Sequence, residues 1–366
     1  MLYCTGKRYG KEGIGTEDFA LALLEWFDRE KRPMPWRETK DPYRIWLSEI
    51  MLQQTRVDTV RGYYERFLRA FPTVAHLAKA TEEEVLKEWQ GLGYYSRARN
   101  LHRAAQEILR QWNGVFPDSY DAILSLTGIG PYTAGAVASI AFDRQVPAID
   151  GNVYRAASRL FGIRENIERP SVQRDIRDAV LSQMPSERPG DYNQALMELG
   201  ATLCVPGTPD CARCPLSSRC DAREAGDAAD LPYHEKKAPP KPVQVAVCIL
   251  EHHGKILVTR RSERLLKGLY VFVLIENETP DALPEVLSAD GLQVSELTNA
   301  GNARHVFTHR IWEMTLYRGN LTLPPGPPFT EREDYRLVSR EELRALPTPT
   351  AMKAALRLIE ADELRI

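Results

Sequence analysis

The stretch "LSLTGIGPYTAGAVASIAF" at residues 124–142 predicts two helices joined by a turn that holds two glycines. Gly128 and Gly130 flank Ile129, and Pro131 takes the first position of the second helix, where its missing N–H is not needed. Glycines let the backbone come close to a partner, and the amides that begin a helix favour an anion such as a phosphate. A helix connection that only needs a tight turn has the same pattern, so both interpretations stay open.

Two neighbouring stretches favour the interpretation of this hairpin as a binding element. The stretch "QGLGYYSRARNL" (90–101) is a related turn, with two glycines before a helix and two arginines close by. The stretch "VPAIDGNV" (146–153) places Asp150 just ahead of another helix. An aspartate there is a good helix N-cap, and taken alone it favours capping over catalysis.

A second carboxylate, Glu49, favours a catalytic role for Asp150. Glu49 lies in "DPYRIWLSEIMLQQT" (41–55), which begins with an aspartate cap and a proline at the first helical position. Trp46, about one turn before Glu49, and Leu52, about one turn after it, share its helix face. Desolvation on this apolar stripe should raise the pKa of Glu49 and let it act as an acid near neutral pH. The alternative is a surface glutamate at the edge of the stripe.

Four of the six cysteines lie in "CVPGTPDCARCPLSSRC" (204–220), with six, two and five residues between them. The N-terminus lacks the basic and apolar run of a secretory signal, so we expect a cytoplasmic protein with reduced thiols and a metal rather than disulfides. Four thiolates suit either zinc or an iron–sulfur cluster. The spacing argues against zinc, because four-cysteine zinc sites usually pair two C-x2-C knuckles.

The composition sets the scale of the fold. A chain of 366 residues with 43% hydrophobic and 27% charged residues is typical of a soluble globular protein of two domains. No stretch approaches the roughly 18 apolar residues that a membrane span needs, so we expect no membrane partner. The net charge is −2, so any surface that binds nucleic acid must be a local patch.

The organisation of the chain changes after Cys220. Residues 1–225 predict a mainly helical domain, with a first helix capped by Thr16. The further helices are expected at 42–55, 56–70, 82–90, 96–112, 118–126, 132–142, 152–161, 171–183 and 191–203. Residues 226–242 predict a linker, because Pro239, Pro240 and Pro242 cannot lie inside a helix or a central strand. Strand-like alternation and a final helix predict an α+β domain at 243–366.

These motifs together resemble the helix-hairpin-helix DNA glycosylases of the endonuclease III superfamily, and within it the MutY family of adenine DNA glycosylases. The resemblance covers nearly the whole first domain. It rests on the cysteine spacing and on "PWR", "WLSEIMLQQTRV", "GLGYYSRARNL", "GIGPYTAGA", "AIDGNV" and "NQALMELGATLC". It implies a helix-hairpin-helix domain with a [4Fe–4S] cluster on Cys204, Cys211, Cys214 and Cys220, followed by a Nudix-like domain.

The resemblance also implies a reaction, the removal of adenine mispaired with 8-oxoguanine or guanine in double-stranded DNA. Glu49 would be the acid and would also activate water, and Asp150 would stabilise the oxocarbenium ion. Tyr132 and Asn152 would support the sugar. Relatives that also cleave the DNA backbone carry a lysine where this chain has Tyr132, so we expect a monofunctional glycosylase.

Further residues match DNA-contact positions of the family. In the first domain they are Trp36, Arg37, Gln54, Thr55, Leu92, Gly93, Tyr94, Gly128, Gly130 and Gln194. Tyr94 would stack in the duplex where the base has left and Gln54 would supply hydrogen bonds, although core packing is the commoner role of aromatic residues. In the second domain Phe307, Thr308 and His309 stand where the family has a lesion-reading Phe-Ser-His motif.

The second domain departs from its relatives in two ways. No Arg-Glu-x-x-Glu-Glu cluster follows Gly268, so pyrophosphatase activity is not expected, and "LYVFV" (269–273) replaces the usual Trp-x-Phe-Pro stretch. Two other functions stay open. One is a related glycosylase that acts on T:G mismatches or oxidised pyrimidines, and the other is a non-catalytic protein that binds DNA lesions. The chain is expected to be a monomer, associated with the nucleoid if it is bacterial.

Overall fold

The computed structural model describes residues 16–235, 239–307, 309–322 and 335–363. The chain divides into two compact units by its internal contacts. The first comprises Met1–Lys79 and Asn100–Lys236, and the second comprises Ala80–Arg99 and Lys237–Ile366. None of the described helices combines the length and the apolar character needed to cross a membrane.

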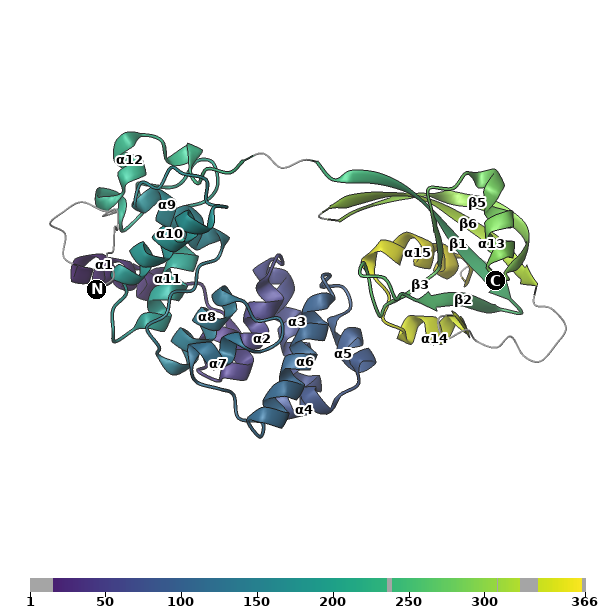
Figure 1. The fold of residues 1–366 in the computed structure, drawn as a ribbon, viewed down its shortest axis with the longest axis horizontal. Coiled ribbons are helices and arrows are strands. Elements are labelled where there is room, and N and C mark those ends of the chain that lie inside the picture. The colour runs from purple at the N-terminus through teal and green to yellow at the C-terminus, as the bar shows by residue number, and fades with distance from the viewer. Residues whose placement is uncertain (1–15, 236–238, 308, 323–334, 364–366) are drawn as a thin grey trace. The chain divides into compact units, whose positions relative to one another are not determined.

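The N-terminal part of the chain is helical (Figure 1), as the sequence predicts. Its α-helices are α1 (Thr16–Glu30), α2 (Pro42–Leu52), α3 (Val57–Ala70), α4 (Val74–Lys79), α5 (Glu82–Trp89), α6 (Ser96–Gln111), α7 (Tyr120–Leu124), α8 (Pro131–Phe142), α9 (Gly151–Leu160), α10 (Pro170–Ser182), α11 (Pro189–Thr202) and α12 (Asp221–Ala225). Short 3-10 turns cover Pro35–Arg37, Ser217–Arg219 and Ala228–Asp230.

Caps decide where several of these helices begin. Asp41 accepts a hydrogen bond from the Tyr43 amide at 2.9 Å, and Pro42 follows it at the first position of α2. Ser119 caps α7 in the same way, through the Ala122 amide at 3.3 Å. The expected helix 42–55 ends at Leu52 instead, because Gln54 adopts a left-handed φ of 57°.

One core cluster of the first unit lies between α1, α9, α10 and α11. The buried side chains come from the face of each helix where apolar residues recur at helical spacing. They include Leu23, Phe27, Val153, Ala157, Ile176, Val180, Tyr192 and Leu199. Helix α8 differs, because every residue from Thr133 to Ile140 is buried. It is therefore a central helix enclosed by its neighbours.

The C-terminal part is built on a mixed sheet of seven strands with the order β3-β2-β1-β6-β5, in which β4 also pairs with β1 and β7 with β2. The strands are β1 (Lys241–His252), β2 (Lys255–Arg260), β3 (Tyr270–Val271), β4 (Val273–Glu276), β5 (Gln293–Val306), β6 (Arg310–Thr322) and β7 (Tyr335–Val338). Strands β1 and β6 run parallel, and the other pairs are antiparallel. The predicted α+β class is confirmed.

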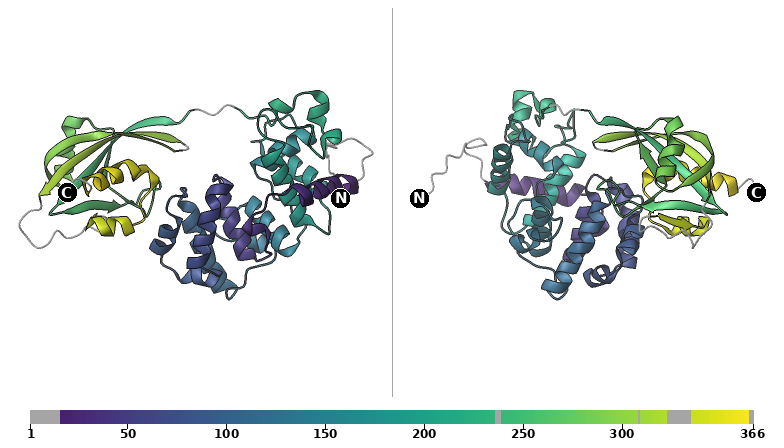
Figure 2. Two further views of the ribbon diagram at one scale, coloured as in Figure 1. Left: turned by 180° about the vertical axis from the view of Figure 1, so that it is seen from behind. Right: turned by 45° about the vertical axis from the view of Figure 1, so that its right-hand side comes forward.

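Helices cover both faces of this sheet (Figure 1). Alternate residues of β1 point to opposite faces. Val245, Val247 and Ile249 share one core with α14 (Arg340–Ala345) and α15 (Lys353–Glu363). Ala246, Cys248 and Leu250 share the other core with α13 (Leu283–Ala289). The left view of Figure 2 shows α14 and α15 in yellow from behind, on one side of the sheet.

The expectation that Pro242 lies outside a central strand is wrong. Pro242 belongs to β1 and stands opposite Ile311 of β6. Pairing of β1 with β4 begins only at Val245, so Pro242 has a neighbouring strand on one side. A proline is tolerated there because its missing N–H can face the open side.

Candidate active site

Glu49 lies on α2 and is 6% exposed. Ile45 and Trp46 of the same helix are buried beside it, which confirms the apolar stripe and excludes a surface position. Burial raises the pKa of Glu49 to about 7. A hydrogen bond from Tyr132 acts in the opposite direction, and the charge of Asp150 raises the pKa further. The carboxyl group can therefore be protonated near neutral pH.

Asp150 is the N-cap of α9. Its Oδ1 accepts a hydrogen bond from the Val153 amide at 2.8 Å, and its Oδ2 accepts one from Asn152 Nδ2 at 2.8 Å. Burial raises the pKa of Asp150, and these hydrogen bonds oppose the rise. The cap and the second carboxylate of the site are thus the same side chain, so the two interpretations of Asp150 do not compete.

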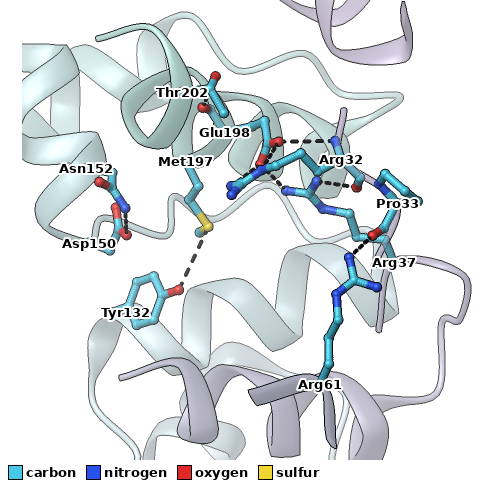
Figure 3. A network of polar contacts seen from close by, with 10 residues as sticks. All are labelled: Arg32, Pro33, Arg37, Arg61, Tyr132, Asp150, Asn152, Met197, Glu198 and Thr202. Carbon is cyan, nitrogen blue, oxygen red and sulfur yellow. Dashed lines mark hydrogen bonds and ion pairs between the residues drawn. The ribbon is translucent and has the colours of Figure 1, made fainter. Parts of the chain in front are cut away.

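Tyr132 joins the hairpin to the carboxylate on α2. It is the second residue of α8, and its hydroxyl donates a hydrogen bond to Glu49 Oε2. The same hydroxyl lies 3.8 Å from Met197 Sδ (Figure 3). Burial and the two neighbouring carboxylates raise the pKa of Tyr132 well above its usual value, so the phenol stays protonated.

A cavity of about 660 Å³ opens in front of these groups. Its volume is typical of a small-molecule site and is ample for one nucleobase. The predicted residues that line it are Trp36, Arg37, Glu49, Gln54, Thr55, Tyr132, Asp150, Asn152 and Gln194. The structure therefore brings together residues of five separate sequence motifs. Trp36 also packs edge-on against Tyr64, with ring centroids 5.3 Å apart, so its core role and its site role coexist.

Glu198 is a site residue that the sequence analysis missed. Its side chain is 1% exposed and lines the same cavity. Arg32 Nε donates to its Oε1 at 2.6 Å, and Arg37 NH2 donates to its Oε2 at 2.8 Å (Figure 3). Burial alone would raise the pKa of Glu198, but these hydrogen bonds lower it to about 2. Its position one turn after Gln194 on the same helix is the signal that could have identified it.

The glycine turn has the predicted place between α7 and α8. Gly128 has a φ of +75°, and a Cβ atom there would lie 2.4 Å from Asn100 Cβ, so only glycine fits. Gly130 is the N-cap of α8 with an extended backbone and open space around its Cα. The second glycine therefore leaves room for a partner that approaches the N-terminus of α8.

The remaining predicted contact residues belong to the second unit. Leu92 is buried, Gly93 has a φ of +72°, and Tyr94 is 49% exposed with a φ of +47°. Phe307 is half-buried between His305 and Trp312, with ring centroids at 4.5 and 5.0 Å, and His309 is exposed. Thr308 lies outside the described residues.

The four clustered cysteines line one small pocket and form no disulfide. Within the described ranges, no three His, Cys, Asp or Glu side chains are placed to hold a single metal ion. A zinc ion needs four sulfurs at about 2.3 Å from one point, whereas a four-iron cage takes one thiolate on each iron and spreads them further apart. The four thiols around one pocket are therefore a donor set that either group could take.

Two arginines of α9 fix the loop that carries Cys204. Arg155 donates from Nε to the Cys204 carbonyl at 2.7 Å and from NH2 to Asn152 Oδ1 at 3.0 Å. Arg159 is 1% exposed and donates from NH1 to Cys204 Sγ at 3.3 Å and to the Val205 carbonyl at 2.8 Å. Polar contacts thus run from Asp150 through Asn152 and Arg155 to the cysteine loop.

Comparisons with known proteins agree with this geometry. Residues 47–180 match the model of the HhH-GPD superfamily base excision DNA repair proteins, and residues 245–358 match the NUDIX domain. A solved structure of a thermostable thymine-DNA glycosylase is 28% identical, with a TM-score of 0.53, and the match covers 57% of this chain and 97% of that one.

Curated relatives from three organisms carry the name adenine DNA glycosylase. The human protein is 31% identical, with 94% of this chain and 74% of that protein covered. The mouse protein is 33% identical, with 93% and 78% covered. The Arabidopsis thaliana protein is 38% identical over 73% of this chain, which spans only 49% of that protein. Similarity over nearly the whole chain, on a helix-hairpin-helix fold with two buried carboxyl groups, places this protein in the family of adenine DNA glycosylases, base excision repair enzymes.

Proposed function

We propose that this chain hydrolyses the N-glycosidic bond of adenine mispaired with 8-oxoguanine or guanine in double-stranded DNA. The observation that carries the proposal is the pair formed by Glu49 and Asp150, which line one cavity large enough for a flipped base. Adenine is a poor leaving group as an anion, so its release needs an acid. Burial keeps Glu49 available as that acid, because it raises the pKa to about 7.

The reaction has two steps. In the first, the Glu49 carboxyl gives its proton to a ring nitrogen of adenine while the bond between the sugar and the base breaks, and the bonding electrons leave with adenine. The sugar becomes an oxocarbenium ion, which the Asp150 carboxylate stabilises. In the second, the Glu49 carboxylate takes a proton from water as the water oxygen bonds to the sugar carbon. Glu49 ends protonated, ready for another cycle.

The same site leaves the DNA backbone intact. Strand cleavage through an imine needs an amine at the reacting carbon. Tyr132 supplies a phenol instead, and the described residues that line the cavity include no lysine. We therefore assign a monofunctional glycosylase.

A [4Fe–4S] cluster on Cys204, Cys211, Cys214 and Cys220 belongs to the same proposal. When bound, it would cross-link the end of α11 to the loop that precedes α12. Arg159 would hold the Cys204 thiolate by a charge-assisted hydrogen bond at 3.3 Å. The proposed work of this loop is structural, because the four cysteines line a pocket of their own, separate from the cavity at Glu49.

The proposal assigns two tasks to two parts of the chain. Residues 1–225 perform the reaction, the linker ends at Pro240, before β1 begins at Lys241, and the sheet domain that follows recognises the lesion. Support for the last part comes from the match to the NUDIX domain and from Phe307 and His309, which flank the position of Thr308 at the start of β6. The protein acts as a monomer in the cytoplasm, on nucleoid DNA if it is bacterial.

Single-turnover base release tests the assignment on four duplexes. They contain adenine opposite 8-oxoguanine, adenine opposite guanine, thymine opposite guanine, and thymine glycol. We expect release of adenine from the first two duplexes. The thymine and the thymine glycol of the other two duplexes should not be released. Release restricted to the pyrimidines would overturn the proposal and favour the likeness to the thymine-DNA glycosylase structure.

Matched variants test the roles of the residues. Glu49→Gln and Asp150→Asn should abolish cleavage while binding to the 8-oxoguanine duplex persists. Glu25→Gln is the control, because Glu25 is an exposed glutamate of α1 outside the cavity. Binding without cleavage in the unchanged protein would instead favour a non-catalytic lesion-binding protein.

A further inference from the structure

The turn between α5 and α6 has an unusual backbone. Gly91, Gly93 and Tyr94 all have positive φ angles, of 102°, 72° and 47°. Glycine adopts such angles readily, but a tyrosine does so only where the surrounding structure holds it. Tyr94 is also 49% exposed, so its ring points outward from a strained position. Some fixed group in the turn has to maintain this conformation.

Arg97 lies directly under the turn, one residue into α6, and is 8% exposed. Its NH2 group donates hydrogen bonds to the Leu92 carbonyl at 3.3 Å and to the Gly93 carbonyl at 3.2 Å. Carbonyl oxygens that accept from a buried cation are held firmly, because the alternative is a buried charge with fewer partners.

The guanidinium group of Arg97 also contacts two aromatic rings. Its central carbon lies 5.6 Å from the centroid of the Tyr94 ring and 5.3 Å from that of Trp89. Both distances are within the range of a cation–π interaction. Trp89 is fully buried, and its Nε1 donates to the Gly93 carbonyl at 3.1 Å. The buried ring of Trp89 is therefore the fixed base, and Arg97 connects it to the exposed ring of Tyr94.

These contacts lie on the inner side of the turn. Burial lowers the pKa of Arg97 to about 10, so the side chain keeps its charge at neutral pH. A lysine would keep the charge, but its compact ammonium would replace the broad guanidinium whose NH2 group binds both carbonyls while its central carbon lies near two rings. The geometry consequently needs an arginine rather than only a positive charge.

We propose that Arg97 is a positioning residue, which acts through Tyr94 and holds its ring in place for insertion into the DNA duplex. The inference rests on the proposed function, in which Tyr94 stacks where the flipped adenine has left. Arg97 itself is buried and need not touch DNA. A preformed ring loses little freedom when it stacks, so its positioning should appear as affinity for the lesion duplex.

A double-mutant cycle tests this role. The affinity for a duplex with adenine opposite 8-oxoguanine is measured in a Glu49→Gln background, which prevents cleavage. Tyr94→Leu removes one stacking partner and should weaken binding by about 5- to 150-fold, the equivalent of one stacked base. Arg97→Lys should weaken binding by about tenfold, within the range of a desolvated cation–π contact. In the Tyr94→Leu protein, Arg97→Lys should cause less than a twofold further loss.

The control is Arg103→Lys, the same change at an exposed position of α6, which should leave the affinity unchanged. Independent effects of Tyr94→Leu and Arg97→Lys, which multiply in the double variant, would overturn the inference. Thermal unfolding is followed for each variant, with Arg97→Gln as a second substitution. Loss of folding in both Arg97 variants would also overturn it, since the arginine would then serve stability alone.

The proposed function fails separately. If the unchanged protein binds the mispaired duplex no better than a matched duplex, the proposed function is wrong, and the role of Arg97 that rests on it is wrong as well. If the preference exists and Tyr94→Leu removes it while Arg97→Lys retains full affinity, only the role of Arg97 is wrong. Fluorescence of 2-aminopurine beside the mispair gives a second measurement, and Arg97→Lys should reduce its increase at saturating protein.

Discussion

The pH dependence of base release follows from the protonation of Glu49. Its pKa is raised from 4.5 to about 7 by burial, so the acid form is fully present below pH 6 and is lost as the pH rises through 7. If this form sets the rate, release falls about tenfold between pH 6 and pH 8 after a plateau at lower pH. A carboxyl group with a pKa of 4.5 would give a fall of about a hundredfold over the same interval with no plateau.

The variant Tyr132→Phe tests directly whether Glu49 is the group that sets the pH dependence. The Tyr132 hydroxyl donates to Glu49 Oε2 and lowers the pKa of that carboxyl, in opposition to burial. Without the donor the pKa of Glu49 should rise. A hydrogen bond to a charged group contributes about 1.5–3 kcal/mol, which corresponds to about one to two pH units. The alkaline fall should therefore move to higher pH, whatever happens to the maximal rate.

The assay is single-turnover release of adenine from the 8-oxoguanine duplex, with enzyme in excess, from pH 5 to pH 9. Enzyme in excess removes product release from the measured rate, so the profile reports the chemical step. Tyr43→Phe serves as the control, because it is the same change at a buried tyrosine of α2 that does not line the cavity. A fall that stays in place or moves to lower pH in Tyr132→Phe would refute the assignment of the acid to Glu49.

Three other predictions follow from single contacts. Glu198→Gln should lower the free energy of unfolding by about 2–3 kcal/mol in urea titrations, because it removes charge-assisted hydrogen bonds. The folded-state pKa of Glu198 is about 2, so this contribution should be present above pH 4.5 and lost as the pH falls towards 2. A variant as stable as the parent would contradict the prediction. Gly128→Ala should lower the thermal midpoint of unfolding, because a left-handed residue costs about 1–2 kcal/mol and the new Cβ would meet Asn100. Gly130→Ala should leave the midpoint unchanged, and equal effects of the two variants would contradict the geometry. Cys211→Ser should lose iron, measured against about four irons per parent chain, and a colourless parent protein with zinc would disprove the cluster.

Local sequence rules predict the helical part of this fold well because its signals are local. Proline after Asp41, the apolar spacing of α1 and the glycine turn at Gly128 each act within one or two helical turns. For the C-terminal part the sequence predicts the α+β class, the longer strands and the final helix, but not the short strands. Strands β3, β4 and β7 have four residues or fewer and depend on partners distant in the sequence, so no local pattern identifies them.

The same distinction applies to the site. Resemblance located Glu49, Tyr132 and Asp150, and the structure brings all three to one cavity. Glu198 was missed because its function depends on Arg32 and Arg37, which are more than 160 residues away in the sequence. A glutamate on a helix has no sequence feature that reveals whether two arginines cover it, and only the packing of α11 on the N-terminal segment decides that.

Glu49 and Asp150 show how one cavity can give two carboxyl groups different surroundings. Burial raises the pKa of both Glu49 and Asp150. The Val153 amide and the Asn152 side chain donate hydrogen bonds to Asp150, and these bonds oppose the effect of burial on its pKa. They are available because Asp150 begins a helix, and the first N–H groups of a helix have no partner within it. Glu49 lies in the middle of α2, where the backbone amides are already used within the helix, and Tyr132 is its neutral donor. In the proposed function, position along a helix therefore separates the acid from the stabiliser, and we expect that an exchange of the two residue types would not exchange the roles.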